Sequence, residues 1–470
     1  MNDKRKVTFG EALLVIAFLI VALISTLKIF GGDPHMAILA STAFATIVAV
    51  RAGYKWEYIE EGILETIKMS MQSVLILMVI GCIIGTWILS GVVPTMIYYG
   101  LKIISPGIFL IATCLICSIV SLATGSSWTT AGTVGIALLG VGAGLGIPAP
   151  VVAGAIISGA YFGDKMSPLS DTTNLAPAMA GTNLFDHIKH MVYTTGPSLI
   201  ISCIFFGILG FKYAGKELDA ALINTFLDTL SSTFHLSPLL LIPPLLVIAM
   251  VVFKVPALPG LVGGTVLGGL FAFLFQGAGM TDIIGAAHYG YESATGVEAI
   301  DSLLSRGGLD SMLWTVSLIL LAMSFGGTLE RTGMLHVIVE KMLKVAKSRG
   351  SLVVTTFLTC VFCNLTTGDQ YMSIVLPGRM FKEAYEEKGL HPKNLSRCLE
   401  DFGTITSPFI PWNTCGNFMY TTLMVHPFAY APYAILNWVN PLVSMFYGFT
   451  GITMEKLPED HQENDNKEKA

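Results

Sequence analysis

Long apolar stretches separated by short polar ones run along the whole chain. Several reach about 20 residues, which is the length of helix that crosses a hydrocarbon core of about 30 Å. They cover residues 12–30, 36–52, 70–89, 107–122, 150–162, 193–211, 238–253, 258–275, 312–329, 352–363 and 431–449. The shorter runs adjoin Gly, Ser and Thr, so polar residues interrupt helices and are not confined to loops. The pattern predicts an all-α polytopic membrane protein with broken helices.

Short motifs recur at a separation of about 240 residues, which indicates an internal repeat. The matched pairs are Gly85-Thr86 with Gly327-Thr328, Thr124-Gly125 with Thr367-Gly368, and Ser167-Pro168 with Ser407-Pro408. We expect a first transmembrane repeat at residues 1–213, a linker at 214–236, a second repeat at 237–450 and a charged cytoplasmic tail at 451–470.

Basic residues are distributed unevenly between the matching segments. Lys102 is the only Lys or Arg in residues 93–147, whereas ten lie in residues 331–397. Because cytoplasmic loops carry the excess of Lys and Arg, the two repeats should face opposite ways across the membrane. The prediction is two inverted repeats of about five transmembrane helices, each with a re-entrant hairpin, and both termini in the cytoplasm.

Composition supports the membrane assignment. Hydrophobic residues make up 53% of the 470 residues and charged residues only 13%, against about 25% in soluble domains. The pairs Cys114/Cys117 and Cys360/Cys363 lie inside apolar runs, so we interpret them as small core residues. No ATP-binding motif occurs, which leaves an ion gradient as the energy source. We expect membrane lipid as the surroundings and no nucleic-acid partner.

Four polar interruptions carry the candidate chemistry, at residues 124–133, 163–174, 366–373 and 404–417. In transporters with inverted repeats, such breaks meet near the bilayer midplane, where helix ends and freed carbonyls coordinate ions. Oxygen ligands suit a hard cation such as Na+. The candidate ion or substrate ligands are Thr124, Ser126, Ser127, Asp164, Lys165, Asp171, Thr172, Thr173, Asn174, Thr367, Asp369, Asn413 and Thr414.

Asp171 and Asp369 are the main candidates for carboxylates that hold Na+ or exchange it for H+. A charge at membrane depth costs roughly 2.5–3.5 kcal/mol, which makes a function the first hypothesis for each. The alternative for both is a helix cap that accepts backbone N–H groups. Asp164 and Lys165 could neutralise each other as neighbours, or Lys165 could bind a substrate carboxylate.

Three segments resemble a known family: GAYFGDKMSPLSDTTNLA at 159–176, SLATGSSWTTAGTVG at 121–135 and NLTTGDQY at 364–371. They are similar to the NhaC family of Na+/H+ antiporters, over about residues 10–451. The resemblance implies membership of the ion transporter superfamily, inverted repeats with paired re-entrant hairpins, and usually a homodimer. Similar family members include sodium-coupled malate/lactate antiporters, so the family alone does not fix the cargo.

The expected function is secondary antiport at the plasma membrane, with Na+ exchanged for H+ by alternating access. The alternative is Na+/H+-coupled antiport of a small carboxylate such as malate against lactate, with Lys165, Ser126, Ser127 and Asn413 as its ligands. An intramembrane hydrolase is disfavoured because no His lies in the four breaks. A passive channel is disfavoured because broken helices in inverted copies favour a carrier. We therefore expect no enzymatic activity and no cofactor besides the transported ions.

Overall fold

The computed structural model describes residues 5–214 and 220–457. Within these residues, eight helices are long and apolar enough to cross a membrane, or nine if one bent pair counts as a span. The predicted class, an all-α polytopic membrane protein, is confirmed. Residues 1–4, 215–219 and 458–470 lie outside the described residues. Residues 215–219 belong to the expected linker, and residues 458–470 make up most of the expected tail.

In the described residues, the first half of the chain forms ten α-helices. They are α1 Phe9–Ile24, α2 Pro34–Arg51, α3 Trp56–Leu89, α4 Val92–Ile103, α5 Pro106–Thr124, α6 Ser127–Thr130, α7 Ile136–Gly144, α8 Ala149–Met166, α9 Asp171–Ala180 and α10 Leu184–Ala214. The predicted apolar runs in this half fall on these helices, and the run at 12–30 continues from α1 into a π-helical segment, Ser25–Ile29. The run predicted at 70–89 is the end of the much longer α3.

The second half continues with thirteen helices, several of them short. They are α11 Ala220–Thr233, α12 Ile242–Val252, α13 Ala257–Gln276, α14 Met280–Tyr289, α15 Glu298–Leu304, α16 Leu313–Arg331, α17 Met334–Leu343, α18 Arg349–Thr367, α19 Met372–Glu387, α20 Pro392–Leu399, α21 Thr414–Leu423, α22 Pro427–Tyr430 and α23 Ile435–Thr450. A π-helical segment, Glu400–Thr404, continues α20.

Helix breaks occur at the predicted polar interruptions. α5 ends at Gly125 and α18 ends at Gly368, with φ of 69° and 65° respectively. Glycine adopts this left-handed conformation without the penalty that a Cβ imposes. At Gly125 a Cβ would lie 2.7 Å from Leu169, so the turn also needs glycine for space. Ser127 and Asp369, which follow the two turns, are both buried.

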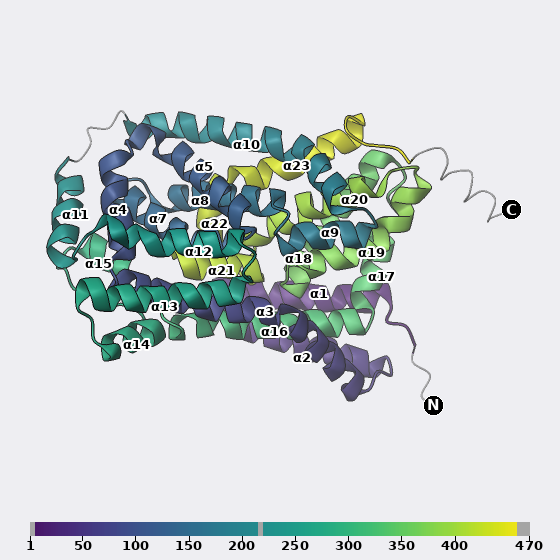
Figure 1. The fold of residues 1–470 in the computed structure, drawn as a ribbon. Helices are drawn as coiled ribbons and strands as arrows, with labels where there is room; N and C mark the ends of the chain where they lie inside the picture. Colours follow the sequence, from purple (N-terminus) through teal and green to yellow (C-terminus); the bar gives the residue numbers. More distant parts are fainter. Residues whose placement is uncertain (1–4, 215–219, 458–470) are drawn as a thin grey trace.

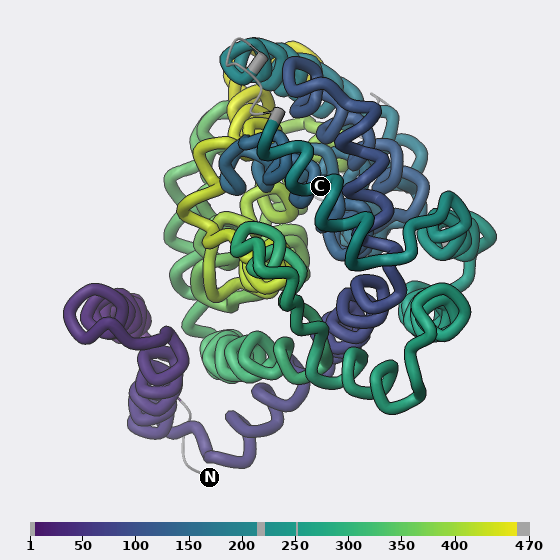
Figure 2. Tube along the Cα trace, turned by 90° about the vertical axis from the view of Figure 1, so that its left-hand side faces the viewer, coloured from purple at the N-terminus to yellow at the C-terminus, as the bar shows by residue number. Residues whose placement is uncertain are grey.

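The two halves of the chain pack into one another. α23 packs against α8 and α10 of the first half, and α16 packs along α3 (Figure 1). Figure 2 shows α1 and α2, in purple, at one side of the molecule, where α2 packs on α16 and α1 on α17. The interior between α3, α5, α8 and the breaks is therefore built from both halves.

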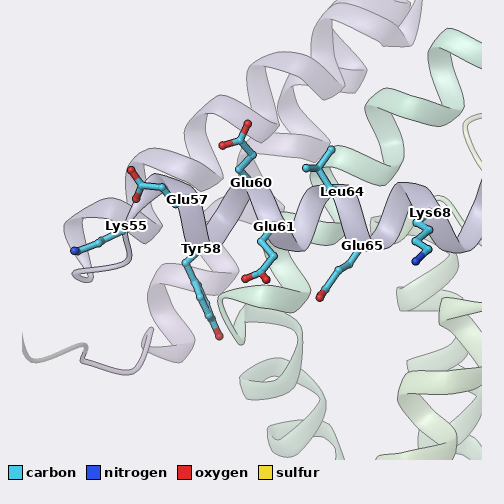
Figure 3. Close-up of a pocket in the computed structure, with 8 residues that line it drawn as sticks. All are labelled: Lys55, Glu57, Tyr58, Glu60, Glu61, Leu64, Glu65 and Lys68. Carbon is cyan, nitrogen blue, oxygen red and sulfur yellow. The ribbon is translucent and has the colours of Figure 1, made fainter.

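The start of α3 carries an acidic face. Glu57, Glu60, Glu61 and Glu65 follow one another along its first turns (Figure 3), and a surface hollow of about 770 Å³ lies over them. Arg331 at the end of α16 pairs with Glu61 and Glu65. The 34 residues of α3 span about 51 Å, more than a hydrocarbon core of about 30 Å. This hollow lies on the charged part of α3 and includes none of the helix breaks.

Candidate functional site

A cavity of about 440 Å³ lies where the helix breaks come together. Its wall contains five of the predicted site residues: Thr124, Ser126, Asp164, Asp171 and Thr414. Breaks from both halves thus open onto one space. The cavity combines carboxylate, hydroxyl and carbonyl groups at the ends of interrupted helices, which is the chemistry that holds a hard cation.

Asp164 is the carboxylate best placed to take a ligand. It belongs to α8 and is only 6% exposed. Its Oδ2 accepts hydrogen bonds from the backbone N–H and the hydroxyl of Ser127, at 3.1 and 2.7 Å. No residue of the described ranges donates to its Oδ1. Because a buried ionised oxygen without a partner is costly, this atom needs a proton or a cation.

Asp171 lies at the exposed side of the same cavity. It is the first residue of α9, but the side chain that caps this helix is Ser170, which accepts from the N–H of Thr173. Asp171 instead accepts from the N–H of Thr172 at 2.8 Å and from the hydroxyl of Tyr371. Because its hydrogen bond with Tyr371 reaches the second half of the chain, Asp171 does more than cap α9.

Asp369 lies behind the cavity wall and is not part of it. Its Oδ1 accepts from the N–H of Met372 at 3.1 Å, at the start of α19, and its Oδ2 accepts from the hydroxyl of Ser70 at 2.9 Å. Both carboxylate oxygens therefore have a donor. Asp369 therefore acts as a helix cap that also contacts α3 through Ser70. Its neighbours Gln370 and Tyr371 line the cavity.

Lys165 does not pair with its neighbour Asp164, so the expectation of local neutralisation is wrong. Its ammonium donates to the carboxylate of Asp401 and, at 2.7 Å, to the amide oxygen of Asn440. Both side chains of the Lys165–Asp401 pair are fully buried. The helical geometry of α8 explains the difference, because consecutive residues on a helix point to different faces. Lys165 is thereby directed away from the cavity wall.

Most of the remaining predicted residues hold the helix breaks in shape through caps and hydrogen bonds to backbone carbonyls. Ser126 caps α6 through the N–H of Thr129, and Asn413 caps α21 through the N–H of Cys415. Thr173 donates to the carbonyls of Asp164 and Lys165 at 3.1 and 3.0 Å. The others are Asn174, exposed and bonded to Pro168 and Ser170 carbonyls; Thr367, bonded to the Cys363 carbonyl; and Thr172 and Thr414, both buried.

Several cavity residues were not predicted. Gln72 and Ser73 of α3, Gln370 and Cys415 line the cavity, together with Lys254 from the turn between α12 and α13. The signal available for Gln72 and Ser73 was a polar pair inside an apolar run. Trp128 also lines the cavity and stacks on Phe418, with ring centroids 4.3 Å apart. No group of three or more His, Cys, Asp or Glu suited to a metal ion occurs in residues 5–214 and 220–457.

An all-helical membrane protein with helix breaks and carboxylates around an internal cavity has the construction of an ion-coupled secondary transporter. The sequence model of the Na+/H+ antiporter family matches residues 159–452. The chain belongs to this family, and the predicted resemblance is confirmed.

Three relatives show how similar the whole chain is. The Na+/H+ antiporter NhaC of Alkalihalophilus pseudofirmus is 38% identical, with 96% of this chain and 98% of the relative covered. The malate-2H+/Na+-lactate antiporter of Bacillus subtilis is 40% identical, with 96% of each covered. The arginine/ornithine antiporter ArcD of Halobacterium salinarum is 38% identical, with 98% of this chain and 96% of the relative covered.

Proposed function

We propose that this protein exchanges Na+ for H+ across the plasma membrane by alternating access. The observation that carries the proposal is the unpartnered Oδ1 of Asp164 beside the cavity where breaks of both halves meet. Such an atom accepts either a proton or a sodium ion, and the two compete for it. Relatives named Na+/H+ antiporters share more than a third of the sequence over nearly the full length.

The ion site that we propose centres on Asp164, with Asp171 as a second carboxylate at the exposed side. Hydroxyl and carbonyl oxygens of Thr124, Ser126 and Thr414 border the same cavity. We retain Asp369 as a support that connects the second break to α3 through Ser70. Sodium takes several oxygen ligands, so the mixture of side chains suits the ion better than one carboxylate would.

The architecture proposed for this function consists of inverted repeats at 1–213 and 237–450. Matched local geometry supports it: Gly91 and Gly333 both precede a helix with positive φ, and Gly125 and Gly368 both end one. We place both termini in the cytoplasm on the distribution of basic residues. A homodimer is the expected assembly on the family resemblance.

A small-carboxylate antiporter is the second candidate, and the cavity gives it some support. A volume of about 440 Å³ exceeds what a bare ion needs, and Lys254 supplies a positive charge at the wall. The Bacillus subtilis relative is named for malate and lactate. In this alternative Lys254 would bind the carboxylate, because Lys165 is already paired with Asp401.

Proteoliposomes with an imposed pH gradient separate the two candidates. We expect NaCl alone to collapse the gradient, Asp164→Asn to lower the rate at least 100-fold, and Asp171→Asn to lower it about tenfold, equivalent to about 2.8 and 1.4 kcal/mol. Asp228→Asn, on the exposed surface of α11, is the matched control. A response that requires malate or lactate would establish the second candidate, and wild-type rates in Asp164→Asn would remove Asp164 from the site.

A further inference from the structure

A second carboxylate, Glu400, is buried near Asp164 and has no assigned role. It is the first residue of the π-helical segment after α20 and is 0% exposed. Neither of its carboxylate oxygens has a hydrogen-bond donor in the described chain. Thr172 and Thr404 lie beside it, but neither hydroxyl reaches hydrogen-bond geometry. Glu400 is absent from the cavity wall, so no open water is available to it there.

The charges around Glu400 do not balance. Its electrostatic neighbours are Lys165 and Asp164, and Lys165 is paired with Asp401, which also lies 3.8 Å from the guanidinium of Arg397. Among the described residues this cluster therefore holds two cations and three carboxylates, and it lacks one positive charge. Because unbalanced charge is expensive in a low-dielectric interior, the cluster requires one proton or one monovalent cation.

Other titratable groups do not supply that charge. Those buried on the helices packed around this segment are Cys360 and Cys363 on α18, Tyr385 on α19 and Cys398 on α20. On α10, His187 lies near Lys165, and His190 contacts Arg397 and the carbonyls of Lys393 and Thr453 but not Glu400. Thiols and phenols are neutral at physiological pH, and the imidazole of His187 is bonded to Ser396. Asp171 on α9, the second carboxylate of the proposed sodium site, is exposed to the cavity, where water screens its charge, so it is not counted in the buried cluster.

A proton suits Glu400 and a sodium ion suits Asp164. Sodium needs several oxygen ligands, and Asp164 faces the cavity where they occur, whereas a proton needs only one carboxylate oxygen. Two hydroxyls lie between the carboxylates. Ser170 lies beside Asp164, Thr172 lies beside Glu400, and their hydroxyl oxygens are 3.2 Å apart.

We propose that Glu400 is the proton-binding carboxylate of the exchange, and that a proton on Glu400 and a sodium ion on Asp164 exclude each other because the cluster lacks a single positive charge. This inference rests on the proposed Na+/H+ antiport. When Na+ binds Asp164, the O–H bond of Glu400 breaks and its electron pair stays on the carboxylate. The proton leaves the cluster for water, so one sodium ion that enters is balanced by one proton that leaves.

The test measures two reactions on Glu400→Gln in proteoliposomes: Na+-driven proton movement, and exchange of radioactive for ordinary sodium, which needs no proton release. Gln resembles the protonated carboxyl group, which excludes sodium from Asp164, so we expect both reactions to fall at least 100-fold at neutral pH. The apparent sodium affinity of the wild type should fall about tenfold per pH unit as the pH is lowered through the competing range, and in the variant it should stay at the low value at every pH. Glu387→Gln, exposed at the end of α19, is the control.

The outcomes separate this inference from the proposed function. Absence of Na+-driven proton movement in the wild type would overturn the proposed function itself. Normal wild-type exchange with retained pH dependence in Glu400→Gln would overturn only the role of Glu400. Sodium exchange at the wild-type rate in Glu400→Gln would show that a neutral residue 400 does not exclude sodium and would also overturn the inference. If Glu400→Gln aggregates, Glu400→Asp keeps an ionisable group, and it must retain the pH-dependent sodium affinity.

Discussion

Lys165 of α8 and Asp401, which are 236 residues apart in the sequence, form a fully buried ion pair that joins the two halves of the protein. Thr194 of α10 donates a further hydrogen bond to Asp401 at 3.0 Å, and Asn440 of α23 accepts one from Lys165 at 2.7 Å. Four helical segments therefore meet at one pair of charges, next to the proposed ion site.

Breaking this pair from one side should destabilise the protein strongly. Removing one partner of a buried ion pair leaves the other charge uncompensated and costs about 3–5 kcal/mol. We expect Lys165→Met to lower the thermal unfolding midpoint in detergent more than Lys165→Met combined with Asp401→Leu does. A double variant that loses the sum of the two single losses would show that the charges do not interact.

The break after α5 should not tolerate a side chain. Gly125→Ala meets both the cost of positive φ, about 1–2 kcal/mol, and backbone atoms of Leu169 and Ser170 at 2.7–2.9 Å. Gly333→Ala is the matched control, because Gly333 has φ of 76° and nothing within 4 Å of the added Cβ. We expect Gly125→Ala to lose sodium transport and more thermal stability than the control. Equal effects would mean that the close approach to Leu169 is unimportant.

The stability of the loop between α14 and α16 should depend on Asp301. This carboxylate accepts from Ser293 Oγ, the N–H and hydroxyl of Thr295, and the N–H of Gly296 at 2.7–3.0 Å, and these bonds, with the Thr295 N–H first, lower its pKa. The resulting stability is present above the unfolded pKa of about 3.9 and is lost as the pH falls through the lower folded value. Between pH 6 and 8 the loop should therefore be insensitive to pH.

Asp301→Asn tests this expectation. It should speed amide hydrogen exchange over residues 291–306 at neutral pH, whereas Asp310→Asn, an exposed carboxylate nearby, should leave it unchanged. Unchanged exchange in Asp301→Asn would show that the loop is held by its other contacts.

The inverted arrangement has a direct topological test. Ala149→Cys and Glu387→Cys lie at exposed positions next to the matching connections of the two proposed repeats, residues 145–148 and 388–391. In a background without the native cysteines, an impermeant thiol reagent should modify Glu387→Cys only from the cytoplasmic side and Ala149→Cys only from the outside. Modification of both from one side would contradict the inversion.

The helices and breaks were predictable because they follow from local sequence. Apolar length gives the helices, and Gly125, Gly368, Ser170 and Asn413 mark their ends by conformational freedom and capping. Asp164 was recognised as a charge in an apolar setting. The sequence did not predict that Asp164 would be a better ion ligand than Asp171. That difference depends on which carboxylate oxygens receive hydrogen bonds after folding.

The long-range partners could not be predicted from local patterns. Lys165 is adjacent to one carboxylate in sequence and binds another 236 residues away, since the direction of a side chain on α8 decides the contact. At Glu400 the local sequence does not distinguish a solvated helix end from a buried position. Only the packing of α9 and α18 around residues 400–404 distinguishes the two.

The single missing positive charge in the buried cluster also bears on how transport responds to voltage. If one proton on Glu400 replaces one sodium ion on Asp164, the cluster carries the same charge in both loaded states. Moving a net elementary charge across 100 mV is worth about 2.3 kcal/mol, and a cycle of this kind would move none. Exchange confined to these residues would then be electroneutral, driven by the two concentration gradients and indifferent to the membrane potential.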